Sequence, residues 1–239
     1  MKTKRLTDVF GNAILDYYQG KNTIIETYSS IGGWDELPVK YLFRSFEQMP
    51  FLEQKALELS HGRVLDLGCG AGSHSLYLQH KKHFVKPIDI SEGAIEVCKK
   101  RGLEHAEMIN LWDLKDQKFD TILALMNGAG ICGSIKNMSN FLQHLSSLLH
   151  PGGQILMDSS DIIYMYEDEQ GEPDLSDIDH YYGDVEFESK YKGKLSGKHP
   201  WLYIDFPNLQ QHAFLQNLSC ELIEKGPHYD YLAKLTLKD

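Results

Sequence analysis

The sequence predicts an α/β fold, a doubly wound and mostly parallel sheet of seven strands. The first observation is a short apolar run, Arg63–Leu67, which ends in the alternating glycines Gly68, Gly70 and Gly72. The second is the helical pattern that begins at Ser73, directly after this turn. The third is the alternation of apolar runs and amphipathic helices that continues to residue 158, which is typical of parallel sheets built from strand–helix–strand units.

The first 60 residues are predicted to form a helical cap, separate from a main domain at residues 61–239. Apolar side chains recur at near-helical spacing from Leu6 to Tyr17, and Gly20 follows as a stop signal. Pro50 is placed to begin a second helix that runs to Leu59.

Arg44 is the cation of interest in this cap. It stands between Phe43 and Phe46, and a guanidinium in such a place can hold a ligand carboxylate through two parallel N–H donors. The alternative is an ordinary surface arginine paired with Glu47 or Glu53.

The glycine turn indicates the type of ligand. Glycines without a Cβ allow close approach of a ligand to the backbone, and the helix that follows presents its N-terminus. A dinucleotide fingerprint would require glycine where Ser73 stands. Asp66, two residues before the first glycine, would repel a pyrophosphate and attract an ammonium group. These features favour a nucleoside that carries an amino-acid tail.

The remaining elements follow in order. The predicted strands of the sheet after the first are residues 83–89, 106–110, 119–126 and 154–158, and the predicted helices between them are residues 92–101 and 138–149. Ser91 is a predicted N-cap, and Gly102 ends its helix.

The last third of the sequence begins with acids. Seven of them, from Glu167 to Asp179, crowd a stretch with Pro and Gly that is typical of a solvated loop, with a cation-recognising lid as the alternative. Residues 185–192 and 200–205 alternate as strands and predict a β-hairpin, so that an insertion occupies about residues 165–206. Residues 208–218 are the last predicted helix, and residues 220–224 and 229–237 are the closing strands.

The stretch Asp66-Leu-Gly-Cys-Gly-Ala-Gly72 resembles motif I of the class I S-adenosylmethionine-dependent methyltransferases. Asp89, at the end of the next strand, and the Pro-Gly-Gly turn after His150 also match this family in the same order. The resemblance implies a Rossmann-like sheet whose last strand is antiparallel. It implies S-adenosylmethionine as the cofactor, with Asp89 on the ribose hydroxyls.

The resemblance also implies a set of site residues. Those expected at the methyl donor are Asp66, Gly68, Cys69, Gly70, Gly72, Asp89, Ile90, Asn110, Leu111, Met126, Asn127 and Arg44. Those expected at the methyl acceptor are Asn127, Asp158, Tyr191, Trp201 and Tyr203. The alternative for the three aromatic residues is simple sheet packing, and the alternative for Asn127 is a turn asparagine that stabilises its own loop. No residue is identified as a general base, and no metal site is predicted. Asn127 is followed by Gly-Ala-Gly and not by the Pro-Pro-Tyr of enzymes that methylate nucleobase or glutamine amino groups, which disfavours that subclass.

Composition narrows the partners. The net charge of −10 argues against a nucleic-acid substrate, so a small-molecule acceptor is expected. No signal-peptide or membrane-spanning pattern is present, and the four cysteines show no paired spacing, so we expect a cytoplasmic protein with reduced thiols. The alternatives are a nicotinamide-dependent oxidoreductase and a non-catalytic S-adenosylmethionine-binding protein. The acceptor atom and the oligomeric state stay open.

Overall fold

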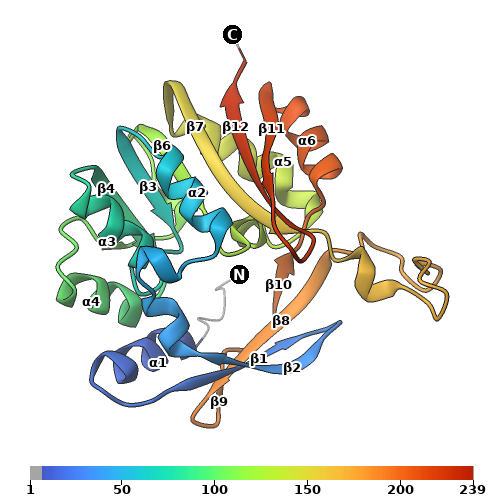
Figure 1. Ribbon diagram of the computed structural model, residues 1–239, viewed down its shortest axis with the longest axis horizontal. Coiled ribbons are helices and arrows are strands. Elements are labelled where there is room, and N and C mark those ends of the chain that lie inside the picture. The colour runs from blue at the N-terminus through green and yellow to red at the C-terminus, as the bar shows by residue number, and fades with distance from the viewer. Residues whose placement is uncertain (1–6, 239) are drawn as a thin grey trace.

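The computed structural model describes residues 7–238 and contains two β-sheets (Figure 1). The larger sheet has seven strands in the order β11-β12-β7-β6-β3-β4-β5. Its strands are β3 (Arg63–Leu67), β4 (Phe84–Asp89), β5 (Glu107–Met108), β6 (Phe119–Ala124), β7 (Leu149–Ser160), β11 (Leu218–Lys225) and β12 (Asp230–Leu237). The last strand, β12, is antiparallel to both of its neighbours, while the strands from β7 to β5 are parallel. The predicted doubly wound sheet is confirmed.

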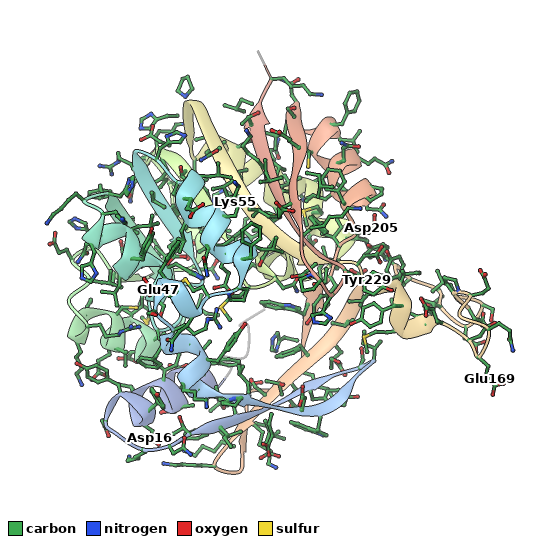
Figure 2. All side chains as sticks on the ribbon, viewed as in Figure 1. Asp16, Glu47, Lys55, Glu169, Asp205 and Tyr229 are labelled. Carbon is green, nitrogen blue, oxygen red and sulfur yellow. The ribbon has the colours of Figure 1, made fainter. Side chains whose placement is uncertain are left out.

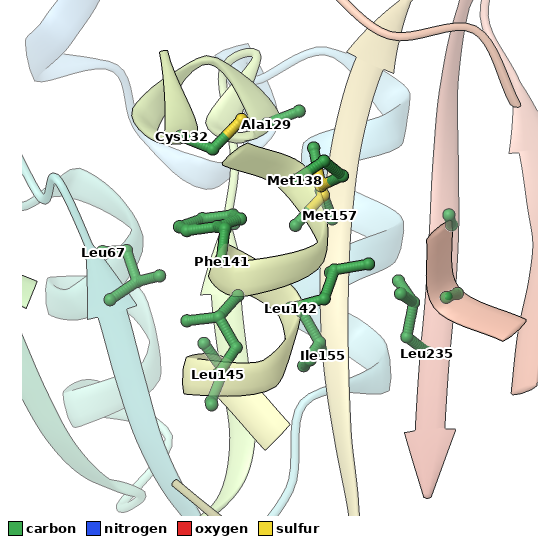
Figure 3. Packing of buried hydrophobic residues seen from close by; sticks show 14 of the residues in the cluster. Leu67, Ala129, Cys132, Met138, Phe141, Leu142, Leu145, Ile155, Met157 and Leu235 are labelled. Atoms are coloured by element: carbon green, nitrogen blue, oxygen red, sulfur yellow. The ribbon is translucent and has the colours of Figure 1, made fainter. Parts of the chain in front are cut away.

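Helices cover both faces of this sheet because successive strand residues point in opposite directions. Leu65, Ile122 and Ile155 pack on one face with the apolar residues of α5 (Ile135–Ser147) and α6 (Phe206–Leu215). Figure 3 shows Ile155 next to Leu142 of α5. The residues next to them in sequence, such as Val64 and Leu123, pack on the other face under α2 (Phe51–Leu59) and α3 (Ser73–His80). Within residues 7–238 no helix is both long and apolar enough to cross a membrane.

The second sheet has the order β10-β8-β1-β2, with β9 paired to β8. Its strands are β1 (Ile24–Ser29), β2 (Gly33–Pro38), β8 (Asp184–Tyr191), β9 (Lys194–Leu195) and β10 (His199–Leu202). The predicted insertion is therefore present, since β8 and β10 pair as antiparallel strands. In Figure 1 and in Figure 2, which has the same view, this sheet lies below the larger one.

The prediction of a helical cap is wrong for residues 24–38, which form the β1–β2 hairpin. Within the described residues 7–60, helix occurs as α1 (Val9–Tyr18), α2 and two short 3-10 turns, η1 (Val39–Phe43) and η2 (Phe46–Gln48). The cause is tertiary, because β1 pairs with β8, as in Glu26 opposite Lys190. The second sheet thus takes strands from both sides of the predicted boundary at residue 60, and the division into two domains stays a prediction.

The acidic residues lie in the connection between β7 and β8. A short 3-10 helix, η5 (Ile163–Tyr166), is followed by residues without helix or sheet strand, and the connection projects from the molecule in Figure 1. It returns to the body at Tyr181 and Tyr182. The Tyr181 hydroxyl donates to Asp205 Oδ2 at 2.6 Å, and the Tyr182 hydroxyl donates to Asp161 Oδ1 at 2.8 Å.

Candidate active site

The predicted site residues lie at the carboxyl ends of neighbouring parallel strands. In the order β7, β6, β3, β4, the strands bring Asp158, Asn127, the glycine turn and Asp89 to one edge of the sheet. Ligands bind at this edge in doubly wound folds, at the point where the strand order reverses.

The glycine turn leaves its middle glycine open. Gly68, Gly70 and Gly72 have φ angles of +63°, +53° and +79°, in the left-handed region that favours glycine. No atom of residues 7–238 lies within 4 Å of the place where a Cβ on Gly70 would stand, leaving aside its chain neighbours. A Cβ on Gly72 would instead stand 2.9 Å from Cys98 Sγ. The turn therefore packs against the protein at Gly72 and has room for a ligand at Gly70.

Asp66 lies behind this turn. Its side chain is only 2% exposed and accepts a hydrogen bond of 2.6 Å from Ser75 Oγ on α3. Burial raises the pKa of Asp66, although nearby His74 and the Ser75 bond oppose the shift. The carboxyl group is thus placed to act on a ligand mainly through its charge, and it has little surface for direct contact.

Asp89 is hydrogen-bonded through both oxygens. Oδ2 accepts from the Gly70 N–H at 3.0 Å, and Oδ1 accepts from the Ser91 N–H at 2.9 Å. Burial raises the pKa of Asp89, and these two N–H groups oppose that shift. The carboxylate therefore joins the glycine turn to the start of α4 (Glu92–Lys100), for which Ser91 is the predicted N-cap. Ile90 beside it is 68% exposed and offers an apolar surface.

Asn110 and Leu111 follow β5 and are the next predicted donor residues. Asn110 is exposed, and its Oδ1 accepts from the Trp112 N–H at 3.0 Å, which caps a 3-10 turn. Leu111 is 6% exposed and packs in the core.

The exit of β6 has unusual backbone angles. Met126 and Asn127 have φ angles of +61° and +58°, a region where residues with a Cβ are strained and which is frequent at functional sites. Asp158 of β7 holds this exit, since its carboxylate accepts from the Met126 N–H at 3.0 Å and the Gly128 N–H at 3.3 Å. Burial raises the pKa of Asp158 to about 7, against the opposing effect of these N–H groups.

The side-chain amide of Asn127 is bonded within the protein. Nδ2 donates to the Leu202 carbonyl at 3.1 Å, and Oδ1 accepts from Ser159 Oγ at 2.9 Å. These bonds tie the end of β6 to the end of β10, so that the second sheet is fixed relative to the strand exits.

Arg44 is buried, with 9% of its surface exposed. Its Nη2 lies 2.7 and 2.6 Å from the two oxygens of Glu53, and its guanidinium stacks 3.5 Å from the ring centre of Tyr41. The predicted alternative of a pair with Glu53 is thus present, but inside the protein. Within residues 7–238, Arg44 Nε and Nη1 have no hydrogen-bond partner. A buried donor without a partner costs about 1–3 kcal/mol, and more when it is charged.

The three aromatic candidates for the acceptor site lie in different places. Trp201 lies against Gly130, where a Cβ would overlap its indole ring. Tyr203 is half-buried, and burial raises its pKa. Tyr191 is buried with α1, and its hydroxyl donates to Asp16 at 2.8 Å. The structure thus brings Trp201 to the β6 exit and gives Tyr191 packing contacts with α1.

Sequence reasoning missed Tyr41, His74 and Ser75 as parts of this site. Ser75 and His74 lie in the first turn of α3, directly after the glycines, so their places relative to Asp66 follow from the motif itself. Tyr41 and its stacking on Arg44 depend on the η1–η2 connection, for which the sequence carries no comparable signal.

Comparison with known proteins agrees with this geometry. The family described as "Methyltransferase domain" matches residues 58–204, which is more than half of the chain. Methyltransferase GfsG of Streptomyces halstedii is 27% identical over 164 residues, or 62% of this chain and 58% of that protein. Phthiotriol/phenolphthiotriol dimycocerosates methyltransferase 1 of Mycobacterium ulcerans is 32% identical over 108 residues, or 42% of this chain and 38% of that protein. These matches span less than two thirds of either relative.

A solved structure matches over nearly the full length. The S-adenosylmethionine-dependent methyltransferase of Bacteroides fragilis, in complex with S-adenosyl-L-homocysteine, is 44% identical and has a TM-score of 0.91, with 99% of this chain and 97% of that chain covered. CcbJ methyltransferase of Streptomyces caelestis is 14% identical with a TM-score of 0.61, covering 97% and 98%, and shares the fold. The chain belongs to the S-adenosylmethionine-dependent methyltransferases, whose cofactor is S-adenosylmethionine. The alternative prediction, a nicotinamide-dependent oxidoreductase, is therefore wrong.

Proposed function

We propose that this protein transfers the methyl group of S-adenosylmethionine to a small-molecule acceptor. The observation that carries the donor half is the open backbone at Gly70, which lies next to a carboxylate that is already oriented, Asp89. The sulfonium group of the donor supplies an activated methyl group. The protein therefore has to bind the two substrates, align them and exclude water.

The donor nucleoside lies along the strand exits in this proposal. Asp89 accepts from the two ribose hydroxyls, and the exposed Ile90 side chain covers one face of the adenine. Asn110 and Leu111 border the adenine edge. The amino-acid tail passes the glycine turn, where Asp66 attracts its ammonium group. Cys69 belongs to the same glycine turn and is 8% exposed.

Arg44 binds the carboxylate of the tail. Support comes from the Nε and Nη1 atoms, which carry donors without partners among the described residues. Both atoms are covered by protein, so uptake of a carboxylate requires a covering side chain to shift. Met126 Sδ lies 3.8 Å from Arg44 Nη2, and both Met126 and Tyr41 are partly exposed, at 38% and 39%. Such side chains move at low cost.

The acceptor meets the methyl group above the ends of β6 and β7. Asn127 and Asp158 form the base of this region, Trp201 forms a wall against Gly130, and Tyr203 lies further along β10 and its extension. A carboxyl group with a pKa near 7 can take a proton from an ammonium or hydroxyl acceptor at neutral pH. The negative net charge supports a small molecule over a nucleic acid.

Titration calorimetry with S-adenosylhomocysteine tests the donor half. Asp89→Asn is expected to weaken binding by about 10–100-fold, because a charge-assisted hydrogen bond contributes about 1.5–3 kcal/mol. Asp116→Asn, an exposed residue with an asparagine-compatible positive φ, is the matched control and is expected to bind as the unaltered protein does. Absence of binding to the unaltered protein would overturn the proposal.

The acceptor half is tested with donor labelled in its methyl group and a fraction of small metabolites. Label recovered in a small molecule supports the proposal. Donor binding without transfer to any acceptor would favour the non-catalytic binding protein instead.

A further inference from the structure

Four buried ionisable side chains form a cluster beside the glycine turn. Arg44, Glu53, His74 and Asp66 are 9%, 4%, 8% and 2% exposed. Arg44 Nη2 is bonded to Glu53, and His74 Nε2 lies 2.7 Å from Glu53 Oε2. His74 and Asp66 attract each other, and Asp66 is bonded to Ser75. The four side chains come from four separate parts of the fold: the η1–η2 connection, α2, α3 and β3.

The charges in this cluster alternate in sign from Arg44 through Glu53 and His74 to Asp66. Burial lowers the pKa of His74, but its hydrogen bond to Glu53 and the charges of Asp66 and Glu53 outweigh burial and raise that pKa above its usual value. Burial would raise the pKa of Glu53, but His74 and Arg44 bring it below its usual value. With His74 protonated, two cations and two anions balance. When His74 loses its proton, one negative charge is left uncompensated.

We propose that Glu53 and His74 are positioning residues for the amino-acid tail of the methyl donor. Glu53 binds one nitrogen of Arg44 and fixes the guanidinium with Nη1 and Nε free for the carboxylate of the tail. Protonated His74 shares Glu53 with Arg44 and thereby limits how much of the arginine's charge Glu53 neutralises. This inference rests on the proposed function, because it assigns a role to residues behind the same donor site.

A purely structural role does not account for the donors left over on Arg44. Both oxygens of Glu53 bind the single nitrogen Nη2, while Nη1 and Nε donate to no described residue. A buried ion pair is weak evidence for stability, since apolar residues of the same volume often stabilise as well. A further anion that accepts hydrogen bonds from Nη1 and Nε would explain the arrangement. The tail of the methyl donor carries such an anion, its carboxylate.

A dependence on pH follows from the surroundings of His74. The charged groups that act on it are Glu53 from α2, Asp66 from β3 and Arg44 from the η1–η2 connection. As pH rises and His74 loses its proton, Glu53 pairs with Arg44 alone and the local charge becomes more negative. Affinity for a ligand carboxylate is then expected to fall, while affinity for a ligand without the tail stays the same.

The experiment compares two ligands that differ only in the tail. Calorimetric dissociation constants are measured from pH 6 to 8.5 for S-adenosylhomocysteine and for 5′-methylthioadenosine, which lacks the amino and carboxyl groups. The variants are Glu53→Gln, His74→Gln and Arg44→Lys. Glu58→Gln is the matched control, because Glu58 is an exposed glutamate on the same helix α2.

We expect His74→Gln, Glu53→Gln and Arg44→Lys to weaken the binding of S-adenosylhomocysteine about tenfold or more. The same variants are expected to change the dissociation constant of 5′-methylthioadenosine less than twofold. The affinity ratio of the two ligands is expected to fall with rising pH in the unaltered protein and to change less in His74→Gln. Equal weakening of both ligands, or a ratio that does not change with pH in the unaltered protein, would overturn the inference. The second result needs no variant, so it decides even if a variant fails to fold. If the unaltered protein bound neither ligand, the proposed function itself would be contradicted.

Discussion

Asp158 shows how position sets the chemistry of a single residue. It lies on β7 beside the left-handed exit of β6, and two backbone N–H groups donate to its carboxylate. Each of these bonds favours the charged form, yet burial outweighs them and the pKa is about 7. The spacing of the sequence indicated an acid at the end of this strand, but its pKa depends on what covers it.

This pKa predicts how stability changes with pH. Because the folded-state pKa of Asp158 lies above its ordinary value of 3.8, the native state binds a proton that the unfolded chain has released, and stability falls as pH rises towards 7. The loss is complete once the pH is well above 7, where Asp158 is ionised in the native state as well. Asp158→Asn removes this titration. Urea unfolding is expected to show the variant gaining about 2 kcal/mol relative to the unaltered protein between pH 5 and 8.

The control for this measurement is Asp177→Asn, an exposed aspartate in the acidic connection. The pH dependence measured for this control is subtracted from that of Asp158→Asn. A corrected difference for Asp158→Asn that does not change with pH would contradict the raised pKa of Asp158.

At the scale of elements, α1 fixes the start of α4 and with it the loop of Asp89. Asp8 caps α1 through the Gly11 N–H at 2.8 Å, and the same carboxylate accepts from Ser91 Oγ at 3.0 Å and the Gly93 N–H at 3.1 Å. A Cβ on Gly93 would stand 2.6 Å from the backbone carbonyl of Gly11. The two helices are therefore in contact through their backbones.

Gly93→Ala is expected to separate these helices. The added methyl group has no space, and overpacking of this kind costs about 1–3 kcal/mol. The free energy of unfolding should fall by this amount, and S-adenosylhomocysteine should bind more weakly because the Asp89 loop shifts with α4. Glu96→Ala on the same helix removes an exposed ion pair with Lys100 and is expected to cost about 0.5 kcal/mol or less. If Gly93→Ala proves as mild as Glu96→Ala, the close contact of the helices is not essential.

At the scale of the whole molecule, the two sheets are held together by chain segments far apart in sequence. β8 pairs with β10 on one side and with β1 on the other. The side chain of Asn127 and the hydroxyl of Ser159 bind the last residue of β10 and the backbone just after it to the ends of β6 and β7. The acidic connection between β7 and β8 takes no part in either sheet.

Cleavage of this connection is therefore expected to leave the fold intact. A glutamate-specific protease should cut first after the exposed residues Glu167 or Glu169. The two fragments should stay associated, and the cut protein should bind S-adenosylhomocysteine with unchanged affinity. Size exclusion, mass spectrometry and calorimetry check these outcomes. Separation of the fragments would show that the connection, and not the pairing of β8 with β1, joins the two sheets.

The sequence by itself determined the larger sheet, and it predicted the residues of the proposed donor site. Strand, glycine turn, helix and the acid at 89 are local features, since each depends on residues within a few positions of one another. Tertiary structure decided the rest. The β1–β2 hairpin exists because β8 pairs with it, and this pairing joins residues near 26 to residues near 190. The burial of Arg44 against Glu53 and His74, and the pKa of Asp158, likewise depend on side chains that only folding brings together, because burial and charge act through space and not along the chain.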